Sequence, residues 1–174
     1  WLDVSIGGKV IGRIVVELNA RMVPRTCENF RCLCTGERGV GRLSKRPLHY
    51  RGVAFHRVIR GFMIQGGDIV SGNGLGGESV FGGQFDDENL AGEHDAPGVL
   101  SMASGGSNMN GSQFFITTTA APHLDRSSVA FGRVVRGMDV VRQIERSPVG
   151  STDVPLAPIL IDDCGSDADA IPYE

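Results

Sequence analysis

The chain has 174 residues, of which 41% are hydrophobic and 21% charged, and its formal net charge is −3. This balance is typical of one soluble globular domain with a real core, and it excludes a fully disordered chain. No apolar run approaches the roughly 20 residues that a membrane helix needs, and the first residues, WLDVSIGG, lack the basic and apolar regions of a signal peptide. We therefore expect a cytoplasmic protein that does not enter a membrane.

The first third of the chain predicts a hairpin, a helix and a long loop. Residues 2–18 alternate between apolar and polar side chains on both sides of a Gly-Gly turn, which is the pattern of a β-hairpin. Residues 23–36 carry apolar side chains at helical spacing, with a proline near the start and a glycine at the end. Residues 38–52 are rich in Gly and Arg and contain a proline, so we expect a loop there.

Short strands separated by Gly-rich turns dominate the rest of the chain. We expect them at about residues 53–58, 62–67, 98–102, 113–118 and 129–135, with a last strand at 158–165. The segment 137–148 predicts a second helix, because its apolar residues line one face. The pattern therefore predicts a mainly β fold, a closed eight-stranded antiparallel β-barrel capped by two α-helices, since closure removes exposed edges. This domain covers residues 1–165, and residues 166–174 have the composition of an acidic tail or linker.

Neither the cysteines nor the basic residues indicate a metal or nucleic-acid site. Three of the four cysteines fall within residues 27–34, no CxxC pair is present, and the four histidines are scattered. We therefore expect reduced thiols and no metal. Residues 21–60 hold ten Arg or Lys residues and two acidic ones, but they lack the aromatic interleaving and the motifs of nucleic-acid binding. We interpret them as a solvated face and expect no nucleic-acid partner.

Two short motifs resemble enzyme signatures but lack the structural context of those enzymes. GNGLGG at residues 72–77 fits the GxGxxG pattern, yet the segment ESVFGGQF after it does not predict the helix that a dinucleotide site requires. His123, Asp125 and Ser127 are the residue types of a hydrolytic triad, but no GxSxG turn is present and they lie very close in sequence. We favour neither a nucleotide enzyme nor a hydrolase.

The strongest pattern combines three segments: FHRVIRGFMIQGGD (55–68), LSMASGGSNMNGSQFFITT (100–118) and PHLDRSSVAFG (122–132). Each joins a predicted strand to a polar turn. Together they offer an apolar wall and a few polar side chains, which is the composition of a pocket for a peptide or small ligand. The apolar residues are Phe62, Met63, Phe115 and Leu124, and the polar ones are Arg57, Gln65, Gln113 and His123. The residues alone leave open that these segments are simply core strands.

These segments, together with ENFRCLCTGE, GGES and VAFGRVVRGMDVV in the same order, resemble the cyclophilins, a family of peptidyl-prolyl cis–trans isomerases that includes cyclosporin receptors. The similarity runs from about Leu2 to Gly165. It implies an eight-stranded antiparallel barrel with two helices, and catalysed rotation about X-Pro peptide bonds without a cofactor. It also implies that proline-containing peptides and unfolded proteins are the partners, and we expect a monomer.

Position by position, the resemblance implies roles for residues of this chain. Arg57 falls on the catalytic arginine of the family. Phe62, Met63, Phe115 and Leu124 fall on the proline pocket, and His56, Gln65, Gly74, Ala103 and Gln113 fall on positions that line or flank the substrate groove.

Four groove positions depart from the commonest cyclophilins. Ser104 replaces an asparagine that acts mainly through its backbone, and Gly105 replaces an alanine that gates a side pocket. Ser128 replaces a histidine of the proline pocket. His123 replaces a tryptophan that aids cyclosporin binding, so the resemblance implies weakened binding of cyclosporin A with isomerase activity retained.

Two further features resemble particular cyclophilins. The insertion around RPLHYRG, with Cys34, Cys164 and Glu78, is similar to the divergent-loop subgroup, and this similarity implies a disulfide between the two cysteines under oxidation. Inert thiols are the alternative. PHLD and the acidic tail resemble the isomerase domain of large cyclophilins, in which a tetratricopeptide module binds Hsp90; no such repeat lies in this chain. We therefore expect an excised domain, and the alternative function is a proline-peptide binding module that serves as the client-facing arm of a chaperone complex.

Overall fold

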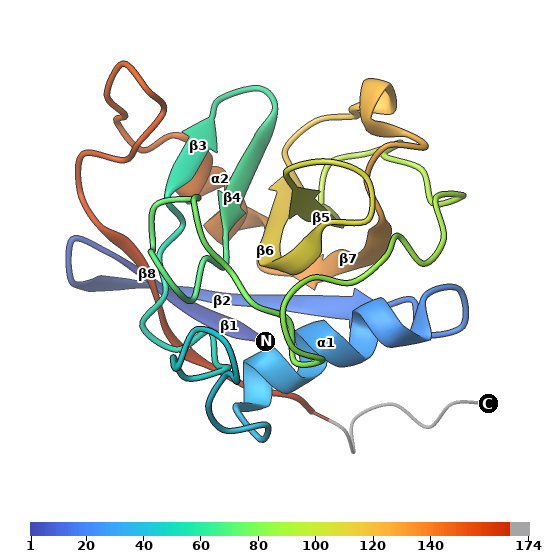
Figure 1. Ribbon diagram of the computed structural model, residues 1–174. Coiled ribbons are helices and arrows are strands. Elements are labelled where there is room, and N and C mark those ends of the chain that lie inside the picture. The colour runs from blue at the N-terminus through green and yellow to red at the C-terminus, as the bar shows by residue number, and fades with distance from the viewer. Residues whose placement is uncertain (168–174) are drawn as a thin grey trace.

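The computed structural model describes residues 1–167, and these residues form one eight-stranded antiparallel sheet that curls into a half-barrel (Figure 1). The strands lie in the order β3-β4-β6-β5-β7-β2-β1-β8. They are β1 (Leu2–Ile6), β2 (Lys9–Leu18), β3 (Arg57–Ile59), β4 (Met63–Gly66), β5 (Val99–Ser104), β6 (Asn110–Thr117), β7 (Ala130–Arg136) and β8 (Ile159–Cys164). The prediction of a mainly β fold with eight strands and two helices is confirmed. Most of the expected acidic tail, residues 168–174, lies outside the described residues.

The register of the sheet builds an apolar inner row across four strands. Val58 of β3 lies opposite Ile64 of β4, which lies opposite Ile116 of β6, which in turn lies opposite Leu100 of β5. All four side chains are at most 1% exposed. Because successive side chains of a strand point to opposite faces, the residues on either side of this row point away from the core.

The barrel is not closed, and the prediction of closure was wrong. β3 and β8 are the two edges of the sheet and do not pair with each other; Ala54, in the loop before β3, forms a bridge with Leu160 of β8. The expected strand at 53–58 divides between two partners, because residues 52–55 hydrogen-bond with β8 and only residues 57–59 pair with β4. The change of partner breaks the ladder, while the loop before β3 still covers part of the edge of β8.

Two helices pack on the sheet where the sequence predicts them. α1 (Pro24–Thr35) starts at a proline, is followed by Gly36 in the left-handed conformation with φ of 72°, and packs on β6 and β7. α2 (Met138–Glu145) packs on β2, β3 and β4. It follows Gly137, where φ is 89° and a Cβ atom would collide with the backbone of β2. The 3₁₀ turn η1 (Pro122–Leu124) is too short to leave a periodic signal in the sequence.

An aromatic cluster joins α1 and the loop after it to the inner face of the sheet. Phe114 of β6 contacts Phe30, Tyr50 and Phe55 edge to face, with ring centroids 5.2, 5.2 and 5.8 Å away. All four side chains are at most 1% exposed, and each such pair contributes about 0.5–1.5 kcal/mol beyond the burial of its area. Phe114 precedes Phe115 in β6, so this packing also fixes the position of the next side chain on the opposite face.

Candidate functional site

A second row of side chains crosses the same strands on the outer face of the sheet. Arg57 of β3 lies opposite Gln65 of β4, Gln65 opposite Phe115 of β6, and Phe115 opposite Ser101 of β5. Opposed residues of antiparallel strands project to the same face, and so does Met63, two residues before Gln65. We call Arg57, Met63, Gln65 and Phe115 the outer row. The structure thus brings together four residues that the sequence assigned to one pocket.

Arg57 stands at the edge of the sheet with its side chain 49% exposed. Its Nη2 atom lies 4.0 Å from Oδ2 of Asp153, a distance beyond hydrogen bonding, so this contact does not occupy the guanidinium donors. The Asp153 side chain is itself 41% exposed. The guanidinium is therefore not buried against a carboxylate, and a ligand on the outer row has access to it.

The apolar wall combines β4, β6 and η1. Met63 and Phe115 are 3% and 6% exposed, and the half-buried Phe62 lies beside His123 of η1, with ring centroids 5.3 Å apart. Leu124, also half-buried, ends η1. Its backbone oxygen accepts a hydrogen bond from the backbone N–H of Ser128 at 3.1 Å, which places Ser128 against this turn. Two of the expected proline-pocket residues, Met63 and Phe115, thus belong to the outer row, while Phe62 contacts η1 and Leu124 ends it.

The expected groove residues form a hydrogen-bonded chain beyond Gln65. Its Nε2 donates to Oε1 of Gln113 at 3.0 Å, and Nε2 of Gln113 donates to the backbone oxygens of Gly74 and Gly76 at 2.8 and 2.7 Å. Gly74 packs on His56, because a Cβ atom there would lie 2.8 Å from Nε2 of the imidazole. Burial lowers the pKa of His56, so the ring is neutral at pH 7.

The three remaining groove positions lie at the far rim of the sheet. Ala103 and Ser104 end β5, and Gly105 begins the turn to β6. Ala103 is half-buried, whereas Ser104 and Gly105 are exposed. The Ser104 hydroxyl donates to the backbone oxygen of Gly106 at 3.0 Å, so the side chain is held by its own turn and its backbone stays at the rim.

Asp68 supports the groove, a role that the sequence pattern did not predict. Its carboxylate, 1% exposed, accepts backbone N–H bonds from Val70, Ser71, Asn73, Gly74 and Gly76 at 2.9–3.2 Å. Burial alone would raise the pKa of this carboxyl, but these hydrogen bonds outweigh burial and lower it. The GxGxxG segment is therefore a loop wrapped around a carboxylate, without the helix that a dinucleotide site requires. A Gly-Gly-Asp before a Gly-rich run was the available signal.

A hydrogen-bonded set of Asp125, His94 and Ser101, which we call the His94 relay, lies beneath Phe115. Oδ1 of Asp125 accepts the backbone N–H of His94 at 2.8 Å and lies 2.9 Å from its Nδ1, while Nε2 of His94 lies 2.9 Å from the Ser101 hydroxyl. The His94 ring stacks on Phe115 at 5.9 Å. Asp125 thus binds His94 and not the neighbouring His123. His94 and Ser101 are both 0% exposed, so this Ser–His–Asp set supports the apolar wall and offers no accessible nucleophile.

The residues of the subgroup resemblance lie away from the outer row. Cys34 in α1 and Cys164 in β8 are free and buried. Burial raises the pKa of Cys34 to about 12 and that of Cys164 to about 11. The carboxylate of Glu78 accepts the backbone N–H groups of Leu43 and Ser44 at 3.0 and 2.8 Å, so Glu78 holds the loop at residues 38–52.

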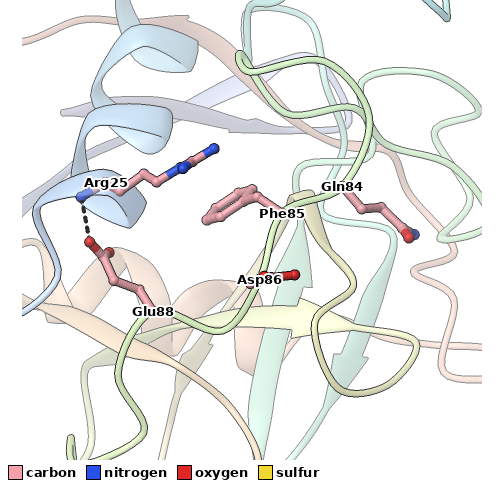
Figure 2. A pocket seen from close by; sticks show the side chains of 5 residues that line it. All are labelled: Arg25, Gln84, Phe85, Asp86 and Glu88. Carbon is pink, nitrogen blue, oxygen red and sulfur yellow. Dashed lines mark hydrogen bonds between the residues drawn. The ribbon is translucent and has the colours of Figure 1, made fainter.

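A cavity of about 450 Å³ lies elsewhere, between the start of α1 and the segment 84–88 (Figure 2). Its lining residues are Arg25, Gln84, Phe85, Asp86 and Glu88. Glu88 accepts the backbone N–H of Arg25 at 2.9 Å and so caps α1, while the Arg25 guanidinium lies 4.4 Å from the Phe81 ring centroid. We place the candidate site on the outer row, because no expected site residue lines the cavity.

The described residues contain no group of three or more His, Cys, Asp or Glu side chains arranged to hold a metal ion. Neither helix in this part of the chain has the length and apolar character needed to cross a membrane.

Asp68→Asn tests how the groove is supported. We expect a loss of about 1–3 kcal/mol in unfolding free energy at pH 7, with faster amide hydrogen exchange at Gly74 and Gly76. Because the native pKa of Asp68 is lowered, its stabilisation is complete above the unfolded value of about 3.9 and is lost as pH falls through the native value. Urea unfolding between pH 7 and 2.5 should show the two proteins converging at the acid end. A pH-independent difference would contradict this role.

Comparison with known proteins agrees with the geometry. The family described as "Cyclophilin type peptidyl-prolyl cis-trans isomerase/CLD" matches residues 1–166. A curated relative from Rhizopus delemar, "Peptidyl-prolyl cis-trans isomerase cyp11", is 53% identical over 165 residues, which are 95% of this chain and 49% of the relative. The chain thus spans about half the length of that relative. Since the family match covers the outer row, its apolar wall and its groove, the chain belongs to the cyclophilin-type peptidyl-prolyl cis–trans isomerases.

Proposed function

We propose that this chain catalyses cis–trans rotation about X-Pro peptide bonds and thereby assists protein folding. The observation that carries the proposal is the register of the outer row. It holds the guanidinium of Arg57, with its donors unoccupied by Asp153, beside Gln65 and the apolar side chain of Phe115. A proline ring needs an apolar slot, and the amide next to it needs a fixed donor. Membership of the cyclophilin family supports the same function.

The reaction requires no bond to be broken. Rotation about a peptide bond costs about 18–20 kcal/mol, because the nitrogen shares its lone pair with the carbonyl. X-Pro bonds populate both isomers but exchange over tens to hundreds of seconds. In the twisted transition state the sharing is lost, and the lone pair of the proline nitrogen becomes a hydrogen-bond acceptor. A donor fixed at that point binds the twisted form better than either planar form, which is the condition for catalysis.

Arginine suits this task better than a titrating side chain. Its guanidinium is permanently charged, carries several donors in a rigid fork, and neither gains nor loses a proton during the reaction. Apolar neighbours such as Phe115 and Met63 remove water and strengthen the hydrogen bond. A charged hydrogen bond of about 1.5–3 kcal/mol corresponds to a rate effect of roughly 10- to 150-fold. We assign this role to Arg57.

The remaining expected residues receive binding roles. The wall formed by Phe62, Met63, Phe115 and Leu124 holds the proline ring, with Ser128 behind η1. The substrate chain then runs along the groove of His56, Gln65, Gly74, Ala103, Ser104, Gly105 and Gln113. His123 lies against Phe62 in place of a larger indole, so we propose that cyclosporin A binds more weakly than it does to tryptophan-containing cyclophilins.

We also propose that the chain belongs to the divergent-loop subgroup. The support is the contact of Glu78 with Leu43 and Ser44 of the inserted loop. For the paired cysteines of that subgroup we favour inert thiols over a disulfide switch. Burial raises the pKa of both thiols well above neutral pH, and a buried thiol that stays protonated reacts slowly.

Arg57→Ala should lower the isomerisation rate of a proline tetrapeptide at least about tenfold, with the far-UV circular dichroism unchanged, because the donor to the proline nitrogen is lost. Exchange NMR without a coupled protease gives the rate directly. Arg60→Ala, an exposed arginine three residues along, is the matched control and should keep its turnover. Unchanged turnover in Arg57→Ala would remove Arg57 from the mechanism. Capture of proline-rich clients that survives the substitution, alongside negligible turnover in the unmodified protein, would favour the peptide-binding module instead.

Titration of free thiols after mild peroxide treatment tests the state of the two buried cysteines. We expect equal, small losses in the unmodified protein and in Cys164→Ser, because both thiols are protonated and shielded. A loss of two thiols per chain that Cys164→Ser abolishes would instead establish the disulfide with Cys34.

A further inference from the structure

A short hairpin, residues 148–157, lies against the free edge of β3. Figure 1 shows it as the orange-red loop beside β3, between α2 and β8. The backbone N–H of Gly150 donates to the oxygen of Val154 at 2.9 Å, and that of Leu156 to the oxygen of Pro148 at 3.0 Å. The hairpin is thus an ordered element and forms one rim of the outer row.

Asp153 joins this hairpin to the strand of the catalytic arginine. Its backbone oxygen accepts the N–H of Val58 at 2.9 Å, on the edge of β3 that faces away from β4. Its φ is 64°, a left-handed conformation that is uncommon for a residue with a side chain. The backbone therefore fixes the place from which the carboxylate projects, and that carboxylate lies 4.0 Å from the guanidinium of Arg57.

The Asp153 carboxylate is half-exposed and makes no hydrogen bond to Arg57, so its field reaches any peptide that covers the guanidinium. Three other charged side chains near this edge already make hydrogen bonds. Glu145 accepts the N–H of Gly61 and a hydrogen bond from Arg142, and Arg60 donates to the backbone oxygen of Arg146. Two unit charges about 6 Å apart in a water-like medium change a binding equilibrium about threefold. Asp153 is therefore placed to select peptides by charge.

Resting on the proposed isomerase function, we infer that Asp153 is a specificity-determining residue of this chain. Its carboxylate offsets the attraction of Arg57 for acidic residues beside the proline and favours basic residues there. Peptides with Lys next to the X-Pro bond are the preferred substrates, and peptides with Glu at the same position are disfavoured.

Two variants separate the charge of Asp153 from its backbone, and a third is a control. Asp153→Gly removes the carboxylate but permits the left-handed φ and keeps the oxygen that accepts from Val58. Asp153→Asn removes the charge and keeps the shape, and asparagine tolerates the same φ. Asp86→Asn is the control, because it changes the net charge equally but lies in the cavity beside α1, away from Arg57.

The test uses pairs of proline peptides that differ only by Lys or Glu, placed either directly after the proline or two residues before it. Exchange NMR gives kcat/KM, and titration gives Kd, for each peptide with each protein. We expect the Lys-to-Glu preference to fall at least about threefold in both Asp153 variants for one of the two placements, and to keep its value in Asp86→Asn. The difference in Lys-to-Glu preference between the unmodified protein and the Asp153 variants should narrow in 0.5 M salt, where the screening length is only a few ångströms.

Preferences that stay unchanged in both Asp153 variants, or that change equally in Asp86→Asn, would overturn the inference. Absent turnover of every peptide by the unmodified protein would overturn the proposed isomerase function. The ratio of the Kd values for the Lys and Glu peptides would still decide the role of Asp153 in that case.

Discussion

The alternation of side chains along paired strands is the constraint on which this molecule depends. In the three neighbouring strands β3, β4 and β6, one register puts Val58, Ile64 and Ile116 into the core and leaves Arg57, Gln65 and Phe115 on the outer face. A slip of one residue would exchange the two rows, burying a guanidinium and exposing three β-branched side chains. The register that buries the inner row is therefore the same register that arranges the outer row. The packing of the inner row thus helps to place the side chains of the outer row.

This coupling explains why an arginine lies among apolar residues in the sequence. The segment around Arg57 alternates because it forms a strand, and its apolar members belong to two different surfaces. Val58 and Ile64 lie in the core, whereas Met63 belongs to the outer row and Phe62 contacts His123 of η1. The supports beneath the outer face are polar and fully engaged, namely the Asp68 carboxylate under the groove loop and the His94 relay under Phe115. They hold the walls still while the outer row stays accessible, which is the preorganisation that catalysis by a fixed donor requires.

The local pattern predicted the hairpin, both helices and most strands, because each depends on periodicity within a short window. The likeness to the cyclophilins predicted the site residues, and the register shows that several of them meet. The polar supports could not be found in this way. Asp68 acts through five backbone groups that any sequence offers, and Asp125 pairs with His94, 31 residues away, in preference to its neighbours. Closure of the barrel was predicted wrongly. The tendency of sheets to avoid exposed edges does not reveal that the chain changes its hydrogen-bonding partner from β8 to β4 at residues 52–57. Nothing in the sequence indicated Asp153, because its proposed role depends on a hairpin that packs against β3.

The most direct measurement is the rate at which a bound peptide interconverts between cis and trans, obtained separately from its Kd by NMR lineshape analysis with Arg57→Lys. Lysine keeps the positive charge but not the planar fork of donors. If a fixed guanidinium stabilises the twisted amide, the bound interconversion should slow at least about tenfold while Kd changes less than about threefold. An unchanged rate of bound interconversion would contradict the mechanism, whatever happened to the affinity.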